Sequence, residues 1–512
     1  MKLASIFTDH MVFQKGMSIK VFGEGQGKGK ILFCCEEREF VSEEEHWCVT
    51  LPAMEYGGPN EMTICLNGKE TTLKDIYIGE VWLAGGQSNM EMPLARTEYG
   101  LEEASHCKND KIRFFMVPRR VKKDAPIRGW HFAKSEGQDT PWRLCCEESA
   151  LPFSAIGYYA AKELQAKLGC VVGVISCNWG GRRIEAFIGK EWIAKEPCLK
   201  EYYEERMALT KNWGEEDYRA HYEAVSESLQ KRYAMVNFDE MQKLRENGVR
   251  ATVGFPGGEF PAIPDGPYHP SYMGCLYDAM YARILPYGIK GIMWYQGESN
   301  ASEKYLEKYL LYMRCMRESF ENPDLVFYAV ELASHNVEWN PDGQFVSDRF
   351  VEGENWAFKR EQQQRASELA PNNYLVTSME LGDLYDIHPI QKRELAHRMA
   401  LKILKYSYGA DIYADQPVFR KATFEKNKVT LEFDHADGLY CPGGLQMVHM
   451  YIADERHVLK KAIIQIEDDK LILTCDEIEN PTIVRYAFDN YYIGYHIYNK
   501  AGLPMAPFRT DR

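Results

Sequence analysis

A candidate nucleophile, Ser88, follows an apolar run and two glycines within residues 82–90 (WLAGGQSNM). An apolar segment that ends in glycines is typical of a parallel strand that delivers the next residues to the carboxyl edge of an α/β sheet, where active sites lie. Glycine also permits a sharp turn and the close approach of another backbone or a ligand. Taken alone this pattern is weak, because many ordinary turns combine an apolar run, glycines and a serine.

A base for this serine is available in residues 383–389 (DLYDIHP). A serine hydroxyl needs a base to remove its proton, and a carboxylate fixes the tautomer of the histidine that does so and stabilises the imidazolium. We therefore predict His388 as the base and Asp386 as its carboxylate partner, with Asp383 as the alternative.

Two further polar clusters offer donors for the oxyanion that forms when a serine attacks an ester. One contains Gly180 and Gly181, and the other contains Gln296 and Glu298. The predicted donors are the backbone N–H groups of Ser88 and Gly181 and the side-chain amide of Gln296, each worth roughly 3–4 kcal/mol in the transition state. Each cluster alone could be a turn or a helix cap, but together they supply every role that a serine nucleophile needs.

The surrounding sequence alternates predicted strands and helices. Apolar segments predict strands at 171–176, 291–295, 325–330 and 374–379, and helical periodicity predicts helices at 155–168, 275–285, 303–320, 356–369 and 391–406. Such alternation implies a parallel sheet covered on both faces. In that sheet the four polar clusters follow strand ends and converge on one rim.

At 512 residues the chain is too long for one compact domain. We predict a β-rich N-terminal domain over residues 1–74, an α/β catalytic domain over 75–408 with a helical insertion at about 195–270, and a C-terminal β-sandwich over 409–512.

The composition narrows the classes of partner. A net charge of −14 argues against a nucleic-acid or anionic-membrane surface. No apolar run approaches the length of a membrane span, and the first residues lack the pattern of a secretion signal. With fourteen scattered cysteines, a cytoplasmic location with reduced thiols is expected. No residue spacing suggests a metal site or an organic cofactor, and the sequence leaves a homo-oligomer open.

Several of these segments resemble one enzyme family. The stretches GGQSNMEMPL, FSAIGYYAAKEL, NWGGRRIEAF, MWYQGESNA and DIHPIQKRELAHRMA, with FTDHMVFQKGMSIKVFGEG and LPAMEYGGPNEMTI near the N-terminus, are similar to the sialate O-acetylesterases, a branch of the SGNH-hydrolase (GDSL-like) carbohydrate esterases. The resemblance spans most of residues 5–405. It implies a three-layer SGNH fold, with a flavodoxin-like parallel sheet flanked by N- and C-terminal β-sandwich domains.

The same resemblance implies deacetylation of O-acetylated sugars, with Ser88 as nucleophile, His388 as base and the blocks of Gly181 and Gln296 as the oxyanion hole. Two departures stand out. The wider SGNH pattern places Asp three residues before the histidine, where this chain has Tyr385, whereas Asp386 fits the DIHP motif of this branch. Longer relatives also carry a larger inserted module, so the resemblance leaves the sugar open among acetylated sialic acid and xylan or mannan fragments.

Candidate substrate contacts are Trp179 and Glu298. Other rings near the motifs could form sugar-stacking walls, and arginines near them could bind a sugar carboxylate; these residues are Trp294, Tyr295, Tyr268, Arg96, Arg182 and Arg183. Two other functions stay open: a non-catalytic carbohydrate-binding protein and a general short-chain carboxylesterase.

Overall fold

The computed structural model describes residues 1–121, 140–214, 216–218, 220–221, 266–267, 269–300, 304–335, 356–383 and 386–512. Its centre is a mixed α/β unit around a sheet with the strand order β10-β9-β11-β8-β12-β13-β14. These strands are β8 (Lys69–Gly86), β9 (Asn109–Met116), β10 (Arg143–Cys145), β11 (Val172–Asn178), β12 (Gly291–Tyr295), β13 (Val326–Val330) and β14 (Asn373–Val376). All neighbours pair in parallel except β10, which is antiparallel to β9.

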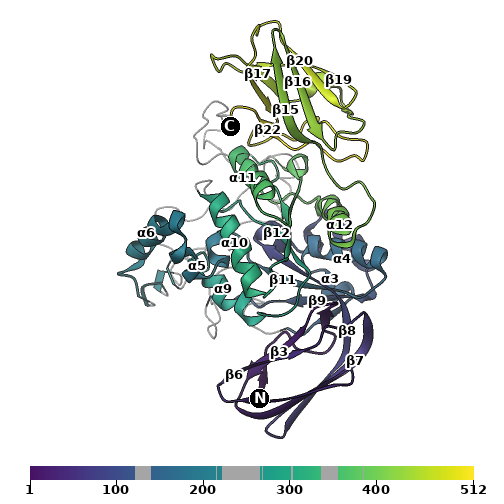
Figure 1. Cartoon of the computed structure of the whole chain (residues 1–512), viewed down its shortest axis with the longest axis vertical. Coiled ribbons are helices and arrows are strands. Elements are labelled where there is room, and N and C mark those ends of the chain that lie inside the picture. Colours follow the sequence, from purple (N-terminus) through teal and green to yellow (C-terminus); the bar gives the residue numbers. More distant parts are fainter. Residues whose placement is uncertain are drawn as a thin grey trace, which may run out of the picture.

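Helices cover both faces of this sheet (Figure 1). On one face α4 (Ala155–Leu168) and α12 (Lys392–Tyr408) pack with Trp82 and Ala84 of β8 in one apolar cluster. On the other face α9 (Cys275–Ala279) and α10 (Tyr305–Ser319) share a second cluster with Val81 and Leu83. The alternation of β8 side chains between two buried clusters is the pattern expected of a strand inside a covered parallel sheet.

Most predicted elements are present with small shifts in their ends. The helix at 155–168 is α4 itself, because Ser154 accepts a hydrogen bond from the Gly157 N–H and Gly169 takes the left-handed conformation that ends it. Helix α11 (Trp356–Leu369) also has its predicted bounds. The helix predicted at 275–285 is wrong in length, since α9 ends at Ala279 and a separate short turn follows. Strand β9 was not predicted.

The N-terminal strands form two groups. Strands β1 (Lys2–Leu3), β3 (Ile19–Glu24) and β6 (His46–Leu51) make a three-stranded sheet, while β4 (Gly27–Phe33), β5 (Glu36–Ser42) and β7 (Gly57–Leu66) connect through β7 to the first half of β8. The second half of β8 lies in the central sheet. The boundary predicted between residues 74 and 75 therefore falls inside a continuous strand, and the division into domains stays a prediction.

The C-terminal region contains two four-stranded antiparallel sheets, in yellow-green at the top of Figure 1. One has the order β15-β16-β20-β19, from β15 (Val418–Glu425), β16 (Lys428–Asp434), β20 (Lys470–Thr474) and β19 (Ile463–Glu467). The other has the order β18-β17-β21-β22, from β18 (Lys460–Lys461), β17 (Met450–Ala453), β21 (Ile483–Tyr486) and β22 (Phe508–Arg509). Both sheets contribute to a third apolar cluster.

Shorter helices complete the described chain: α1 (Ser88–Glu91), α2 (Gly100–Ser105), α3 (Glu147–Ala150), α5 (Lys190–Lys195) and α6 (Lys200–Thr210). Helices α5 and α6 stand to one side of the sheet in Figure 1 and belong in part to the predicted insertion at 195–270, most of which lies outside the described residues. In the described part of the chain, no helix combines the length and the apolar character that a membrane crossing requires.

Candidate active site

Three strand ends meet at the rim of the sheet. Gly86, the last residue of β8, is in register with Asn178 of β11 and with Tyr295 of β12. The backbones then remain joined, because Gln87 N–H donates to the Tyr295 carbonyl at 3.0 Å and Trp179 N–H donates to the Gly86 carbonyl at 3.0 Å. This register explains why segments far apart in the sequence converge beside Ser88.

Ser88 begins helix α1 directly after this junction. Gly86 has a φ of +138°, and a Cβ there would lie 2.1 Å from the Tyr295 carbonyl oxygen, so only glycine fits at this turn. Ser88 itself is half-buried, whereas Gln87 and Asn89 on either side are buried. The turn therefore presents the hydroxyl at the surface of an otherwise closed rim.

His388 and Asp386 lie beside this hydroxyl. The Nε2 of His388 is 2.8 Å from Ser88 Oγ, and its Nδ1 is 3.2 Å from Asp386 Oδ1. The same Asp386 oxygen accepts the His388 backbone N–H at 2.9 Å. Partial burial opposes ionisation of Asp386, but these hydrogen bonds from His388 hold the pKa of its carboxyl below the ordinary value.

Asp383, the alternative carboxylate partner for His388, does not contact the imidazole in the ion pair that the structure shows. Its Oδ1 accepts the backbone N–H of Asp386 at 2.9 Å, and the ion pair with His388 is made by Asp386. Of the two candidate carboxylates, the structure thus brings Asp386 to the imidazole and uses Asp383 to hold Asp386.

A buried polar group next to Ser88 was missed in the sequence. The Nδ2 of Asn89 donates to the Ile387 carbonyl at 2.9 Å and to Glu298 Oε1 at 2.6 Å, while its Oδ1 accepts from Lys392 Nζ at 2.7 Å. Asn89 therefore connects the helix that carries the nucleophile to the residue before His388.

Two titratable members of this group are Lys392, which is buried, and Glu298, which is half-buried. Burial lowers the pKa of Lys392 to about 7, and the nearby carboxylates of Glu298 and Asp386 only partly offset this. Burial also raises the pKa of Glu298, against the hydrogen bond from Asn89. The predicted substrate contact Glu298 thus faces Asn89, and its Oε2 is buried with no partner among the described residues. The signal for Lys392 was its position on the apolar stripe of α12 with Leu395, Ala396 and Met399.

Of the two glycines after β11, Gly180 lies against the nucleophile. A Cβ on Gly180 would be 3.1 Å from Ser88 Cβ, and the Gly180 N–H donates to Glu91 Oε2 at 2.5 Å. Gly181 is exposed, has a φ of +69° and faces open space. Within the described ranges its N–H donates to no acceptor, so this group remains available to a bound molecule.

Gln296 does not have the orientation that an oxyanion donor requires. Its side chain is fully buried, and its Nε2 donates to Asn300 Oδ1 at 2.6 Å, to Gln87 Oε1 at 3.1 Å and to the Arg182 carbonyl at 3.1 Å. Since a primary amide has two hydrogens, three protein acceptors already occupy them. The position at the rim was predicted, but the direction of the amide was not.

Asn300 connects Gln296 to a buried ion pair. Its Nδ2 donates to Glu185 Oε2 at 2.7 Å, and Lys308 Nζ lies 3.0 Å from Glu185 Oε1. Burial opposes the charge on Glu185, but Lys308, Tyr202 and Asn300 together lower the pKa of its carboxyl to about 2. Gln296 is thus connected through Asn300 to a buried ion pair.

Several predicted sugar contacts are part of the core. Trp179, Trp294 and Tyr295 are each at most 1% exposed and present no face to a ligand. Arg182 is also buried, with its guanidinium 5.5 Å from the Trp179 ring centre and its Nη1 3.3 Å from Ser271 Oγ. The prediction that these residues line a sugar site is therefore corrected.

The remaining arginines are more accessible. Arg96 is exposed and acts on Asp386 electrostatically, and Arg183 is partly exposed. Tyr268 and Tyr385 lie outside the described residues. The described residues contain no group of three or more His, Cys, Asp or Glu side chains arranged to hold a metal ion.

Comparison with known proteins agrees with the resemblance seen in the sequence. Residues 268–405 match the model of a family described as carbohydrate esterase, sialic acid-specific acetylesterase. The sialate O-acetylesterase of Rattus norvegicus is 23% identical over 445 residues, which cover 80% of this chain and 74% of that protein. The sialate O-acetylesterase of Homo sapiens is 23% identical over 448 residues, with 80% and 71% coverage.

A solved structure is similar over the whole chain. The crystal structure of a carbohydrate acetylesterase from Xanthomonas citri superposes with a TM-score of 0.76 and 26% sequence identity, covering 100% of this chain and 99% of that one. The resemblance to the sialate O-acetylesterases is thereby confirmed. These similarities indicate that the chain is a carboxylic-ester hydrolase.

Proposed function

We propose that this protein is a carbohydrate O-acetylesterase that removes acetyl groups from O-acetylated sugars through Ser88, His388 and Asp386. The observation that carries the proposal is the geometry at His388, whose Nε2 lies 2.8 Å from Ser88 Oγ while its Nδ1 lies 3.2 Å from Asp386. The similarity to carbohydrate acetylesterases supports the substrate class. We also propose an SGNH three-layer core with flanking β-sandwich domains, and retain the cytoplasmic location as a prediction.

In the first half-reaction, Ser88 Oγ attacks the acetyl carbonyl while His388 Nε2 takes the hydroxyl proton. Asp386 holds the imidazole in the tautomer with hydrogen on Nδ1 and stabilises the imidazolium. The tetrahedral intermediate collapses when His388 returns the proton to the leaving sugar oxygen. The sugar alcohol departs and the acetyl group stays on Ser88.

In the second half-reaction, His388 removes a proton from water, which attacks the acetyl-enzyme. The bond between Ser88 Oγ and the acetyl carbon then breaks as His388 returns the proton to Oγ, and acetate leaves. In both steps negative charge develops on the carbonyl oxygen. We assign its stabilisation to the backbone N–H groups of Ser88 and Gly181, because the amide of Gln296 already donates to three protein acceptors.

The decisive experiment measures acetate release from acetylated xylo-, manno- and sialo-oligosaccharides, with Ser88→Ala as the matched control. We expect acetate from at least one sugar class with the wild type and none with the variant. Retention of wild-type turnover by Ser88→Ala would contradict the proposal, and sugar binding without acetate release would identify a non-catalytic carbohydrate-binding protein. Aryl esters of increasing acyl length separate the remaining alternative, since a general carboxylesterase would accept butyrate as readily as acetate.

A further inference from the structure

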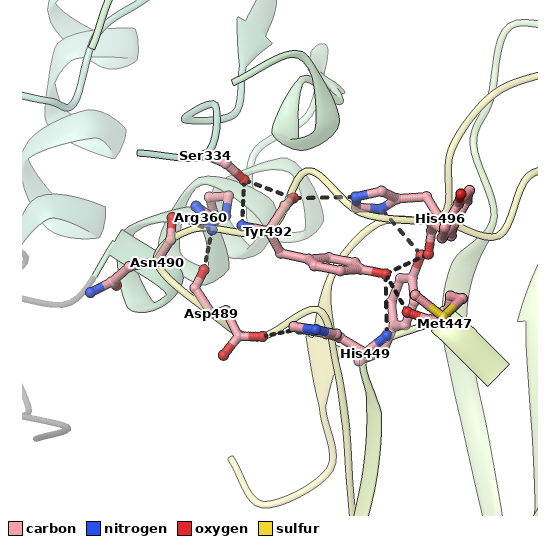
Figure 2. Close-up of polar contacts among 10 residues, drawn as sticks. Ser334, Arg360, Met447, His449, Asp489, Asn490, Tyr492 and His496 are labelled. Carbon is pink, nitrogen blue, oxygen red and sulfur yellow. Dashed lines mark hydrogen bonds and ion pairs between the residues drawn. The ribbon is translucent and has the colours of Figure 1, made fainter. Parts of the chain in front are cut away.

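The C-terminal region contacts the core of the molecule at several places, and one of them lies just after β13. We call residues 489–496 the contact loop, and residues 383–389 the catalytic loop, of which 384 and 385 lie outside the described residues. Figure 2 shows the contact loop against Ser334, which follows strand β13, and against Arg360 of helix α11. Ser334 lies between the two loops and contacts Tyr492 of the contact loop and Asp383 of the catalytic loop.

On the side of the contact loop, Ser334 binds one residue twice. Its Oγ donates to the Tyr492 carbonyl at 2.9 Å and accepts the Tyr492 N–H at 3.0 Å (Figure 2). Ser334 is buried, so no water competes for either hydrogen bond. A hydroxyl that both donates to and accepts from one residue fixes the distance and the direction between the two segments.

Tyr492 is itself held firmly by the C-terminal region. Its hydroxyl lies 2.5 Å from the Tyr495 carbonyl oxygen and accepts the His449 N–H at 3.2 Å, and its ring stacks on His449 with a centroid distance of 3.9 Å. The His496 Nε2 lies 3.3 Å from the Tyr492 carbonyl oxygen. Because Tyr492 binds Ser334, these contacts hold Ser334 in a fixed position relative to the C-terminal region.

Adjacent contacts reinforce the same junction. The His335 N–H donates to the Asn490 carbonyl at 3.2 Å, and Asn490 Oδ1 accepts the Trp356 N–H at 2.8 Å. The guanidinium of the buried Arg360 donates to the carbonyl oxygens of Asp489 and Asn490 (Figure 2). The contact loop therefore meets the core through several hydrogen bonds. His335 provides a second link beside Ser334, because its Nδ1 lies 3.3 Å from the Asp383 carbonyl oxygen.

On its other side, Ser334 holds the start of the catalytic loop. The Ser334 N–H donates to the Met379 carbonyl at 3.1 Å, and the Asp383 N–H donates to the Ser334 carbonyl at 3.2 Å. Between them Gly382 lies flat on the Ser334 backbone, since a Cβ there would be 2.2 Å from the Ser334 carbonyl oxygen. Any shift of Ser334 must consequently move residues 382 and 383.

From Asp383 the contacts run directly to the imidazole. Asp383 Oδ1 accepts the Asp386 N–H at 2.9 Å, and Asp386 Oδ1 lies 3.2 Å from His388 Nδ1. We propose that Ser334 is a positioning residue through which the C-terminal region sets the placement of Asp386 and His388. This inference rests on the proposed function, because Ser334 can position catalytic groups only if His388 acts as the base for Ser88.

The test compares Ser334→Ala with Glu361→Gln. Both change the interface between the core and the C-terminal region. Glu361 binds Arg509 of β22 at 3.0 Å, and none of its contacts among the described residues is with the catalytic loop. We measure kcat and KM on an aryl acetate, and we count competent sites by complete labelling of Ser88 with a fluorophosphonate. Counting sites separates a slower reaction from a smaller folded fraction.

For Ser334→Ala we expect kcat per labelled site to fall by about 10- to 100-fold with KM changed by less than about twofold, because a misplaced catalytic group slows chemistry more than binding. Glu361→Gln is expected to lower the melting temperature and to leave kcat per site unchanged. An unchanged kcat per site in Ser334→Ala would overturn the inference, as would an equal loss in both variants.

If Ser334→Ala does not fold, Tyr492→Phe decides, since it keeps the backbone contacts and removes only the hydroxyl that anchors the contact loop. A fall in kcat per site that Glu361→Gln lacks supports the inference, and an unchanged value overturns it. Wild-type protein that reacts with neither the aryl acetate nor the fluorophosphonate would overturn the proposed function together with this inference. Reactive wild type, inactive Ser88→Ala and fully active Ser334→Ala would overturn the inference alone.

Discussion

Lys392 Nζ lies 2.7 Å from Asn89 Oδ1, which places a buried ammonium group one residue from the nucleophile. Because the ammonium can only donate, it fixes the oxygen of the Asn89 amide on its own side and turns Nδ2 toward the Ile387 carbonyl. The orientation of one amide thus couples the first turn of α1 to the residue before His388.

Replacing Lys392 with Met should change how stability depends on pH. Burial lowers the pKa of Lys392 from 10.5 to about 7 in the folded protein, so above that pH the folded state binds fewer protons than the unfolded state. The stability contributed by this group therefore rises with pH between about 7 and 10.5, by at most about 1.4 kcal/mol per pH unit. Lys392→Met should lack this rise in urea-unfolding free energy. The exposed Lys167→Met is the control, and parallel slopes for Lys392→Met and wild type would contradict the assignment.

Asp386→Asn and Asp383→Asn should differ strongly in activity. Asparagine at 386 can donate to His388 and favour the wrong tautomer, so kcat on an aryl acetate should fall by roughly 10²- to 10⁴-fold. Asparagine at 383 keeps an oxygen for the Asp386 N–H, and its loss should stay below about tenfold, since only a positioning contact is weakened. Similar losses in the two variants would show that the carboxylate at His388 is not decisive.

Gln296→Ala is expected to lower mainly the stability of the protein, whereas Gly181→Ala is expected to lower mainly kcat. Removing Gln296 takes one donor from the buried oxygens of Gln87 and Asn300, which still accept the N–H groups of Ser299 and Ile184. The unfolding free energy should therefore fall by about 0.5–1.5 kcal/mol for each hydrogen bond lost. Its kcat should fall less than the roughly 10²- to 10³-fold expected for loss of an oxyanion donor.

Gly181→Ala meets no atoms but disfavours the positive φ that aims the N–H, so we expect the larger kcat loss there. Kinetics on an aryl acetate and urea unfolding of both variants make the comparison. A kcat loss of the full oxyanion size in Gln296→Ala, without loss of stability, would show that the amide turns toward the substrate after all.

Glu185→Gln should destabilise the fold. It leaves Lys308 as a buried cation without its carboxylate, which costs about 3–5 kcal/mol in comparable sites. Because the pKa of Glu185 is lowered to about 2, its contribution is fully present above about 4.5 and is lost as pH falls toward 2. Urea unfolding at neutral and acidic pH should thus show the variant's deficit shrinking in acid. The exposed Glu201→Gln on α6 provides the control, and a constant deficit at all pH values would exclude this origin.

The sequence was sufficient to predict which residues lie at the rim of the sheet, but not which way their side chains point. Apolar runs that end in polar clusters place Ser88, Gly181 and Gln296 on one rim, because parallel strands end together. Whether the amide of Gln296 points to the substrate or into the protein depends on acceptors from Gln87, Arg182 and Asn300, whose proximity follows from the sheet register rather than from local sequence.

Buried charges were the other feature missed. Lys392 and Lys308 lie on apolar stripes of α12 and α10, where a lysine reads as an exposed residue unless its partner is known. Their partners, Asn89 and Glu185, lie 303 and 123 residues away in the sequence. Trp179 failed in the opposite way, since an aromatic ring after a strand fits a sugar wall or a core equally well until its burial is known.

Strand β8 changes partners along its length: β7 pairs with its first part, β2 (Val12–Gln14) with residues 77–79, and β11 with residues 80–86. A crossover or graft that exchanged the first 74 residues for those of another protein would cut this strand within its ladder with β7, which spans residues 69–78. The N-terminal sheets and the turn that carries the nucleophile are therefore joined by one continuous strand. Chimaeras should tolerate junctions beyond Gly86 better than junctions at the end of the apparent β-rich segment.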